Sequence, residues 1–212
     1  RGATAGAGGV AGAATAGRGA SGTGAGAAGG GSAGTAGGNC GGNQRNGTPF
    51  GCKFAFGTND PGGSLAGLSD LGFVTKWIGY EIDKAGNLPR CDGCSWLSSQ
   101  VAPTALLPVY YAYFIGYFGH ANGFMDGNQN PNGPNLTTDG AQLIKDNRSK
   151  IIEMYAEYAR MSAAAWKTKP LVWLLEGDFV QYAGESQKSP LSYAELGALT
   201  RDITCVIKGN MP

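Results

Sequence analysis

The chain has 212 residues, of which 42% are hydrophobic and 15% charged, and 16 Lys and Arg against 15 Asp and Glu give a net charge of +1. This balance argues against a nucleic-acid-binding protein, whose surface is normally basic. No apolar run reaches the roughly 20 residues that a membrane-spanning helix needs. Because Arg1 comes first and no signal segment follows it, we expect part of a longer or processed chain.

The first 48 residues differ sharply in composition from the rest. They hold half of the 38 glycines, are otherwise rich in Ala, Ser and Thr, and contain no aromatic residue. Such a segment has almost no apolar area to bury, so residues 1–48 are predicted to be a disordered linker. Residues 49–212 carry every Trp, Tyr and Phe and can form one core. A tether before a folded body indicates a further module upstream.

Five cysteines are present, and two of them form a Cys91-Asp-Gly-Cys94 motif. A loop disulfide in an oxidising compartment is the favoured interpretation, with a zinc or redox motif as the alternatives. A zinc site lacks donors, because His120 is the only histidine and there is no second Cys pair of this kind. Cys40 and Cys52 flank the junction of linker and body, where a bridge could hold the incoming chain.

The first half of the body is predicted to contain two strands and a long loop. Residues 53–57 form a short apolar strand that runs into a dense turn signal. Residues 71–82 are rich in β-formers and predict a second strand, although poor alternation leaves a helix as the alternative. Residues 83–103 are predicted to be a loop.

The second half is predicted to alternate strands with helices. Residues 105–118 are apolar and charge-free, which is typical of a strand buried on both faces, and a polar loop follows over 119–134. Thr137 or Thr138 caps a helix over about 139–167, and residues 171–175 form another charge-free strand. A last helix runs from Ser189 or Ser192 to about residue 206.

This β/α order predicts an α/β fold with a parallel sheet of the barrel type. A complete (β/α)8 barrel needs about 250 residues. The body is therefore expected to be the N-terminal portion of a barrel, incomplete as it stands, or else a smaller open α/β domain.

In parallel α/β folds the reacting groups follow the carboxyl ends of the strands. Glu176 and Asp178 come directly after an apolar strand and would share one face if the strand continued. Paired carboxylates suit the hydrolysis of a glycosidic bond, and crowding of like charges raises the pKa of one of them. We therefore predict Glu176 as general acid/base and Asp178 as its partner. The alternative is that these acids cap a turn or pair with Arg.

Other polar and aromatic residues of the predicted loops are candidates for substrate binding. Trp96 is the expected sugar-facing ring, because it lies in a polar loop. The polar candidates at strand ends are Asp60, His120, Asn122, Asp126 and Gln181. No Gly-x-Ser-x-Gly elbow and no phosphate-binding Gly-rich motif are present, which disfavours an esterase and a nucleotide hydrolase. No metal and no cofactor are predicted.

Three segments together resemble secreted bacterial cellulases and related glycoside hydrolases. They are the linker, residues 54–57 and the Leu-Leu-Glu-Gly-Asp-Phe segment at 174–179. The resemblance implies a secreted enzyme acting on β-linked polysaccharide, with a catalytic barrel tethered to a carbohydrate-binding module. Segment 174–178 is similar to the strand-end Glu-Pro-Asp of cellobiohydrolase-like barrels, with Gly177 in place of Pro. The acid/base after strand four would be Glu176, and the nucleophile would lie beyond Pro212. A non-catalytic carbohydrate-binding or cell-surface protein is the alternative.

Overall fold

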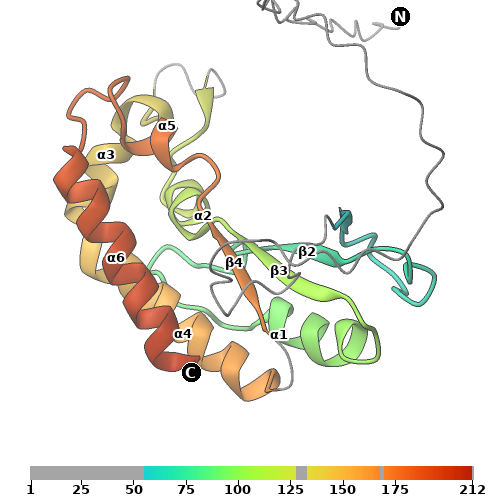
Figure 1. The fold of residues 1–212 in the computed structure, drawn as a ribbon. Coiled ribbons are helices and arrows are strands. Elements are labelled where there is room, and N and C mark those ends of the chain that lie inside the picture. The colour runs from blue at the N-terminus through green and yellow to red at the C-terminus, as the bar shows by residue number, and fades with distance from the viewer. Residues whose placement is uncertain (1–54, 128–132, 168–169, 212) are drawn as a thin grey trace, which may run out of the picture. The chain divides into compact units, whose positions relative to one another are not determined.

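The strands form one parallel sheet. The computed structural model describes residues 55–127, 133–167 and 170–211. Four strands lie in the order β1 (Gly57–Asn59), β2 (Phe73–Ile78), β3 (Leu107–Ala112) and β4 (Val172–Leu175), as Figure 1 shows. All three strand pairs are parallel. The predicted parallel α/β class is confirmed, but these four strands form an open sheet and do not close into a barrel.

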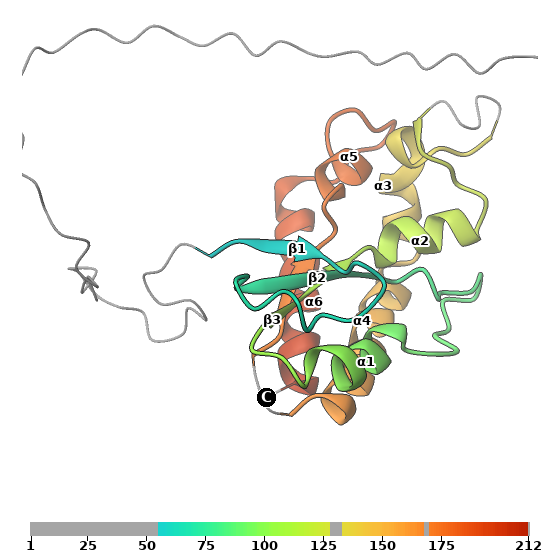
Figure 2. The same ribbon diagram turned by 90° about the vertical axis from the view of Figure 1, so that its right-hand side faces the viewer.

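Helices cover one face of this sheet. They are α1 (Asp92–Trp96), the π-helical turn η1 (Leu97–Val101), α2 (Phe114–Ala121), α3 (Leu136–Asp146), α4 (Arg148–Ala165), α5 (Phe179–Ala183) and α6 (Tyr193–Asn210). Tyr158 of α4 contacts Tyr110 of β3 and Trp173 of β4, with ring centroids 5.7 and 6.3 Å apart. The long helices α4 and α6 pack side by side, and Figure 2 shows both behind the strands.

The buried positions of α4 follow the helical period. Ile151, Met154, Tyr155, Tyr158 and Ala159 are all buried. Their spacing of three or four residues places them on one stripe that faces the sheet. This stripe also brings two tyrosine hydroxyls under the carboxyl ends of the strands.

The prediction that the apolar run 105–118 forms one strand is wrong. The run divides into β3 and the helix α2, and the strand ends before Tyr113. An uninterrupted apolar run does not distinguish a buried strand from a buried helix. Gly119 permits the helix to pack closely, because a Cβ there would lie 2.6 Å from Leu136 Cδ2.

Two further predicted elements differ from the structure. The loop predicted over 83–103 contains α1 and η1, and the single helix predicted over 139–167 is two helices that meet at Asn147. Asn135, not Thr137 or Thr138, caps α3 by accepting a hydrogen bond from the Thr137 N–H. Ser192 caps the last helix as predicted, and a reciprocal hydrogen bond with Glu195 completes the cap. The short helix α5 was not predicted.

The predicted Cys91–Cys94 disulfide is present, but it lies at the start of α1 and not in a loop. Cys205 is an exposed free cysteine. The linker predicted over 1–48 and the possible bridge between Cys40 and Cys52 lie outside the described residues. Among the helices that the structure describes, none combines the length and the apolar character that crossing a membrane requires.

Candidate functional site

The carboxyl ends of all four strands meet at one edge of the sheet, which we call the carboxyl edge. Parallel pairing in register places the segments after Asn59, Ile78, Ala112 and Leu175 there. Polar loops that follow these ends are where parallel α/β proteins assemble their sites. The side chains at this edge therefore define the candidate site.

Glu176 turns the chain sharply at the end of β4. Its φ is 41°, in the left-handed region that residues other than glycine seldom adopt. One carboxylate oxygen, Oε1, accepts hydrogen bonds from the Tyr155 hydroxyl at 2.6 Å and the Ile115 N–H at 2.8 Å. The side chain is only 3% exposed, so it points into the protein and not into a ligand-accessible space.

The burial of Glu176 changes its acidity. Loss of solvent raises its pKa to about 7, although the hydrogen bonds from Tyr155 and Ile115 oppose the shift. Its second oxygen, Oε2, is buried and has no hydrogen-bond partner among the described residues. A protonated carboxyl suits this position, because a bare charged oxygen without a donor is costly to bury.

Asp178 does not share a face with Glu176, contrary to the sequence prediction. The strand ends at Leu175, Glu176 adopts a left-handed backbone conformation, and Asp178 becomes the residue that precedes α5. The Asp178 carboxylate is half-buried and borders a cavity of about 860 Å³. The sequence therefore located both acids at the carboxyl edge but did not predict that they diverge.

Gly177 lets Asp178 approach Tyr111 of β3 and Tyr113, the residue that follows this strand. A Cβ at residue 177 would lie 2.5 Å from the Tyr113 hydroxyl oxygen and 2.7 Å from that of Tyr111. Burial raises the pKa of Tyr113, and the nearby Tyr111 and the carboxylate of Asp178 raise it further. The absence of a side chain at residue 177 thus allows two hydroxyls and a carboxylate to converge.

A second carboxylate joins this cluster through one tyrosine. The Tyr182 hydroxyl lies 3.4 Å from Asp126 Oδ1 and 3.5 Å from Asp178 Oδ2. The two carboxylate oxygens are therefore at most about 7 Å apart, since both neighbour the same hydroxyl. His120 extends the chain of contacts, with Nε2 at 3.0 Å from Asp126 Oδ2. The structure thus brings together three of the predicted residues: His120, Asp126 and Asp178.

An aromatic platform that was not predicted lies beside Asp178. The Trp77 ring stacks on Tyr113 with centroids 4.6 Å apart and planes 18° apart, and contacts Tyr111 at 4.7 Å. Trp77 is 41% exposed. The alternation of β2 contains the signal that could have located it: Val74 and Ile78 are buried on one face, so Trp77 belongs to the other.

The prediction that the Trp96 ring faces a sugar is wrong. Trp96 lies in α1 and is 2% exposed, packed 6.3 Å from the Tyr110 ring. The prediction assumed a loop at this position, whereas the helix turns the ring into the core. A buried indole offers no face to a sugar.

The remaining predicted residues lie apart from the carboxylate cluster or serve local structure. The Asp60 carboxylate pairs with Lys76 at 2.6 Å. Asn122 Nδ2 donates to the carbonyls of Phe118 and Lys84 near the end of α2. Gln181 is exposed on α5 and borders the 860 Å³ cavity. Of these three, Gln181 alone remains near the site.

Glu81 is a buried carboxylate three residues after the end of β2. Its Oε2 accepts from the Gly79 N–H at 3.0 Å, and its Oε1 accepts from the Asp92 N–H and the Tyr158 hydroxyl, both at 3.1 Å. Tyr155 and Tyr158 of α4 therefore each hold one buried glutamate at the carboxyl edge. With both of its oxygens hydrogen-bonded, Glu81 ties the start of α1 to the sheet.

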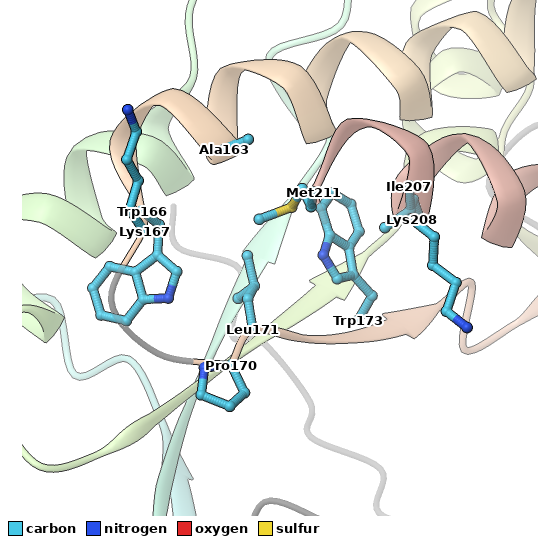
Figure 3. Close-up of a pocket in the computed structure, with 9 residues that line it drawn as sticks. All are labelled: Ala163, Trp166, Lys167, Pro170, Leu171, Trp173, Ile207, Lys208 and Met211. Atoms are coloured by element: carbon cyan, nitrogen blue, oxygen red, sulfur yellow. The ribbon is translucent and has the colours of Figure 1, made fainter. Parts of the chain in front are cut away.

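A second cavity lies at the opposite end of the sheet. It has a volume of about 640 Å³ and is enclosed by the last residues of α4, the start of β4 and the end of α6 (Figure 3). Apolar side chains dominate its wall, among them Trp166, Leu171 and Ile207. Among the described residues of its wall there is no Asp or Glu, so these residues offer none of the chemistry of the carboxyl edge.

The described residues contain no cluster of three or more side chains suited to bind a metal ion. Comparison with known proteins assigns no relative to the chain, since no family model, no curated protein and no solved structure matches it.

Proposed function

We propose that the carboxyl edge is a carbohydrate site and that the chain hydrolyses β-linked polysaccharide there. The observation that carries this proposal is the exposed Trp77 ring, stacked on Tyr113 and adjacent to the Asp178 cluster. Sugar rings pack their C–H faces on such aromatic surfaces. Hydrolysis of a glycosidic bond also requires a pair of carboxyl groups beside the bond.

The structure changes which acid we assign to proton donation. Glu176 is buried against Tyr155, whereas Asp178 is half-buried and borders a cavity. We therefore assign the general acid to Asp178 and a positioning role to Glu176. The hydrogen bonds of the Glu176 side chain hold the left-handed turn that carries Asp178.

Asp126 is the second carboxylate of the proposed reaction. As general acid, Asp178 gives a proton to the glycosidic oxygen as the bond from that oxygen to the anomeric carbon breaks. Asp126 takes a proton from the water molecule whose oxygen bonds to the anomeric carbon. Tyr182 keeps the two carboxylates in one cluster, because its hydroxyl neighbours both.

Secretion and a tethered carbohydrate-binding module complete this proposal. The Cys91–Cys94 disulfide supports an oxidising compartment. The similarity of segment 174–178 to cellulases supports the substrate class, and the Gly- and Ala-rich composition of residues 1–48 supports a tether.

A non-catalytic carbohydrate-binding protein is the second candidate. It is favoured by the structural partners that the acids already have, Tyr155 for Glu176 and His120 for Asp126. In that case the Trp77 platform alone would bind the sugar, and the carboxylates would stabilise the loops.

The test measures hydrolysis and binding on the same variants. The full chain is incubated with soluble β-glucan, and new reducing ends are counted for wild type, Asp178→Asn and the matched control Asp70→Asn, which lies near the start of β2. We expect Asp178→Asn to lose activity by about 100-fold or more, with Asp70→Asn unaffected.

Each remaining outcome is decisive. Full activity of Asp178→Asn overturns its role as the acid. If wild type binds β-glucan without releasing reducing ends, and Trp77→Ala abolishes that binding, the non-catalytic candidate replaces the hydrolase. Neither binding nor hydrolysis by wild type would overturn both candidates.

A further inference from the structure

The 860 Å³ cavity beside Asp178 is lined by residues of α5, of the segment that follows it and of the start of α6. Its wall includes Gly177 and Asp178 on one side and Leu191, Tyr193 and Leu196 on the other. A ligand that lies over Asp178 can therefore continue into this space without leaving the protein surface.

Tyr193 presents an aromatic ring that the fold does not use. It is the first residue of α6 and is 84% exposed, although it borders the cavity. Val180, on the α5 side, is 77% exposed. Large apolar side chains that remain this exposed next to a concavity indicate a surface that binds something.

Hydrogen bonds hold the wall of the cavity in place. The buried Gln187 side chain accepts from the Ala141 N–H and donates to the carbonyls of Leu136 and Gln181. The Leu191 N–H donates to the Ala183 carbonyl at 2.9 Å. The loop between α5 and α6 is thus fixed at both ends, so the cavity is formed before any ligand arrives.

The charge of the wall restricts what the cavity can bind. Asp178 and Glu185 border it, and the described residues of its wall include no Lys or Arg. The two nearby lysines are turned to other partners, Lys145 to the carbonyls of Ser189 and Pro190 and Lys188 to Asp139. Carboxylates without compensating cations repel anionic ligands, whereas the polar groups of Gln181 and Ser186 suit neutral hydroxyls.

We propose that this cavity is a second sugar subsite, which takes a neutral glycan chain that passes over Asp178 and stacks one ring on Tyr193. The proposal rests on the proposed carbohydrate site and adds that its ligand is neutral and long enough to span both places. Acidic polysaccharides such as polyuronates are excluded by Asp178 and Glu185.

The experiment measures binding, which is independent of hydrolysis. Isothermal titration of the full chain with a neutral, thio-linked β-1,4-glucan hexasaccharide that resists hydrolysis is carried out for four proteins. They are wild type, Tyr193→Ala, Tyr193→Phe and the control Thr200→Ala, which changes an exposed residue further along α6. A hexagalacturonate serves as the acidic probe. Thermal melts show that each variant is folded.

We expect Tyr193→Ala to weaken hexasaccharide binding about tenfold, while Tyr193→Phe and Thr200→Ala retain the wild-type affinity. The acidic probe should bind neither wild type nor Tyr193→Ala. Wild-type affinity in Tyr193→Ala, together with loss of binding in Trp77→Ala, would overturn the subsite and leave the proposed function intact. Binding that depends on Tyr193 without any hydrolysis would support the subsite and overturn the hydrolase. Absence of wild-type binding would overturn the subsite directly.

Discussion

The two ends of the parallel sheet are built in opposite ways, although the same strand β4 contributes to both. At the carboxyl edge, Glu176 and Asp178 are held by hydroxyl and backbone donors, and the exposed surface combines aromatic rings with acids. At the other end, β4 begins beside an apolar cavity, and the described residues that line it include no Asp or Glu (Figure 3). This difference separates two tasks: directional polar groups position a site, and apolar packing stabilises the fold.

The largest effect that we expect at the carboxyl edge is the contribution of Glu176 to the pH dependence of the free energy of unfolding. The pKa of Glu176 is near its usual 4.5 in the unfolded chain and about 7 in the folded protein. The folded state therefore binds a proton more tightly, and the stability associated with this proton is complete below pH 4.5 and is lost as the pH rises through 7. We expect the free energy of unfolding to fall by about 3 kcal/mol over this window.

Glu176→Gln is the control for that measurement. An amide cannot ionise, so urea unfolding of this variant between pH 4.5 and pH 8 should lack the contribution of residue 176. The difference between wild type and variant isolates this residue from all other titrating groups. Parallel pH profiles for the two proteins would show that Glu176 is solvated in the folded state.

The second test removes a buried apolar side chain at the opposite end of the sheet, beside the 640 Å³ cavity. Ile207 is buried and borders the apolar cavity, so Ile207→Ala should lower the free energy of unfolding by about 2 to 3 kcal/mol. Binding of the β-glucan hexasaccharide by the folded variant should not change. Lys208→Ala, on the same rim, is the matched control with little effect on stability. A weakened sugar affinity in Ile207→Ala would break the proposed separation of the two ends.

The smallest effects come from a pair of glycine substitutions. In Gly177→Ala the new methyl group would meet the Tyr111 and Tyr113 hydroxyls, displace Asp178 and lower the rate of hydrolysis about tenfold or more. In Gly197→Ala, within α6, nothing lies within 4 Å of the new atom. That variant should gain about 0.5 to 1 kcal/mol in denaturant unfolding, with unchanged hydrolysis. An active Gly177→Ala enzyme would show that the close approach at residue 177 has no role in catalysis.

The sequence predicted the elements whose patterns are local. Strands within 71–82 and at 171–175 follow from β-rich and charge-free runs, and the Ser192 cap follows from residue type. The division of run 105–118 into β3 and α2 was not predictable, because its apolar character is the same throughout. The break at Asn147 likewise lies inside a continuous helical pattern.

The candidate site was predicted in place but not in detail. The strand-end rule placed Glu176 and Asp178 just after an apolar strand, where they lie, whereas His120 belongs to α2 and Asp126 follows that helix. It could not show that a left-handed turn at Glu176 sends two neighbouring acids in different directions. The prediction of Trp96 instead of Trp77 as the exposed ring failed for a similar reason. The exposure of a ring depends on which side of its helix or strand faces the core, and Trp96 was assigned to a loop instead of a helix.

The turn at Glu176 also bears on self-association. Among the described residues β4 pairs only with β3, so its outer edge is the kind of surface on which foreign strands can grow into aggregates. Pro170 lies just before this strand, and the left-handed turn at residue 176 ends it after four residues. An edge this short offers few main-chain groups to a second molecule. We therefore expect the residue that aims Asp178 also to limit strand pairing between neighbouring molecules.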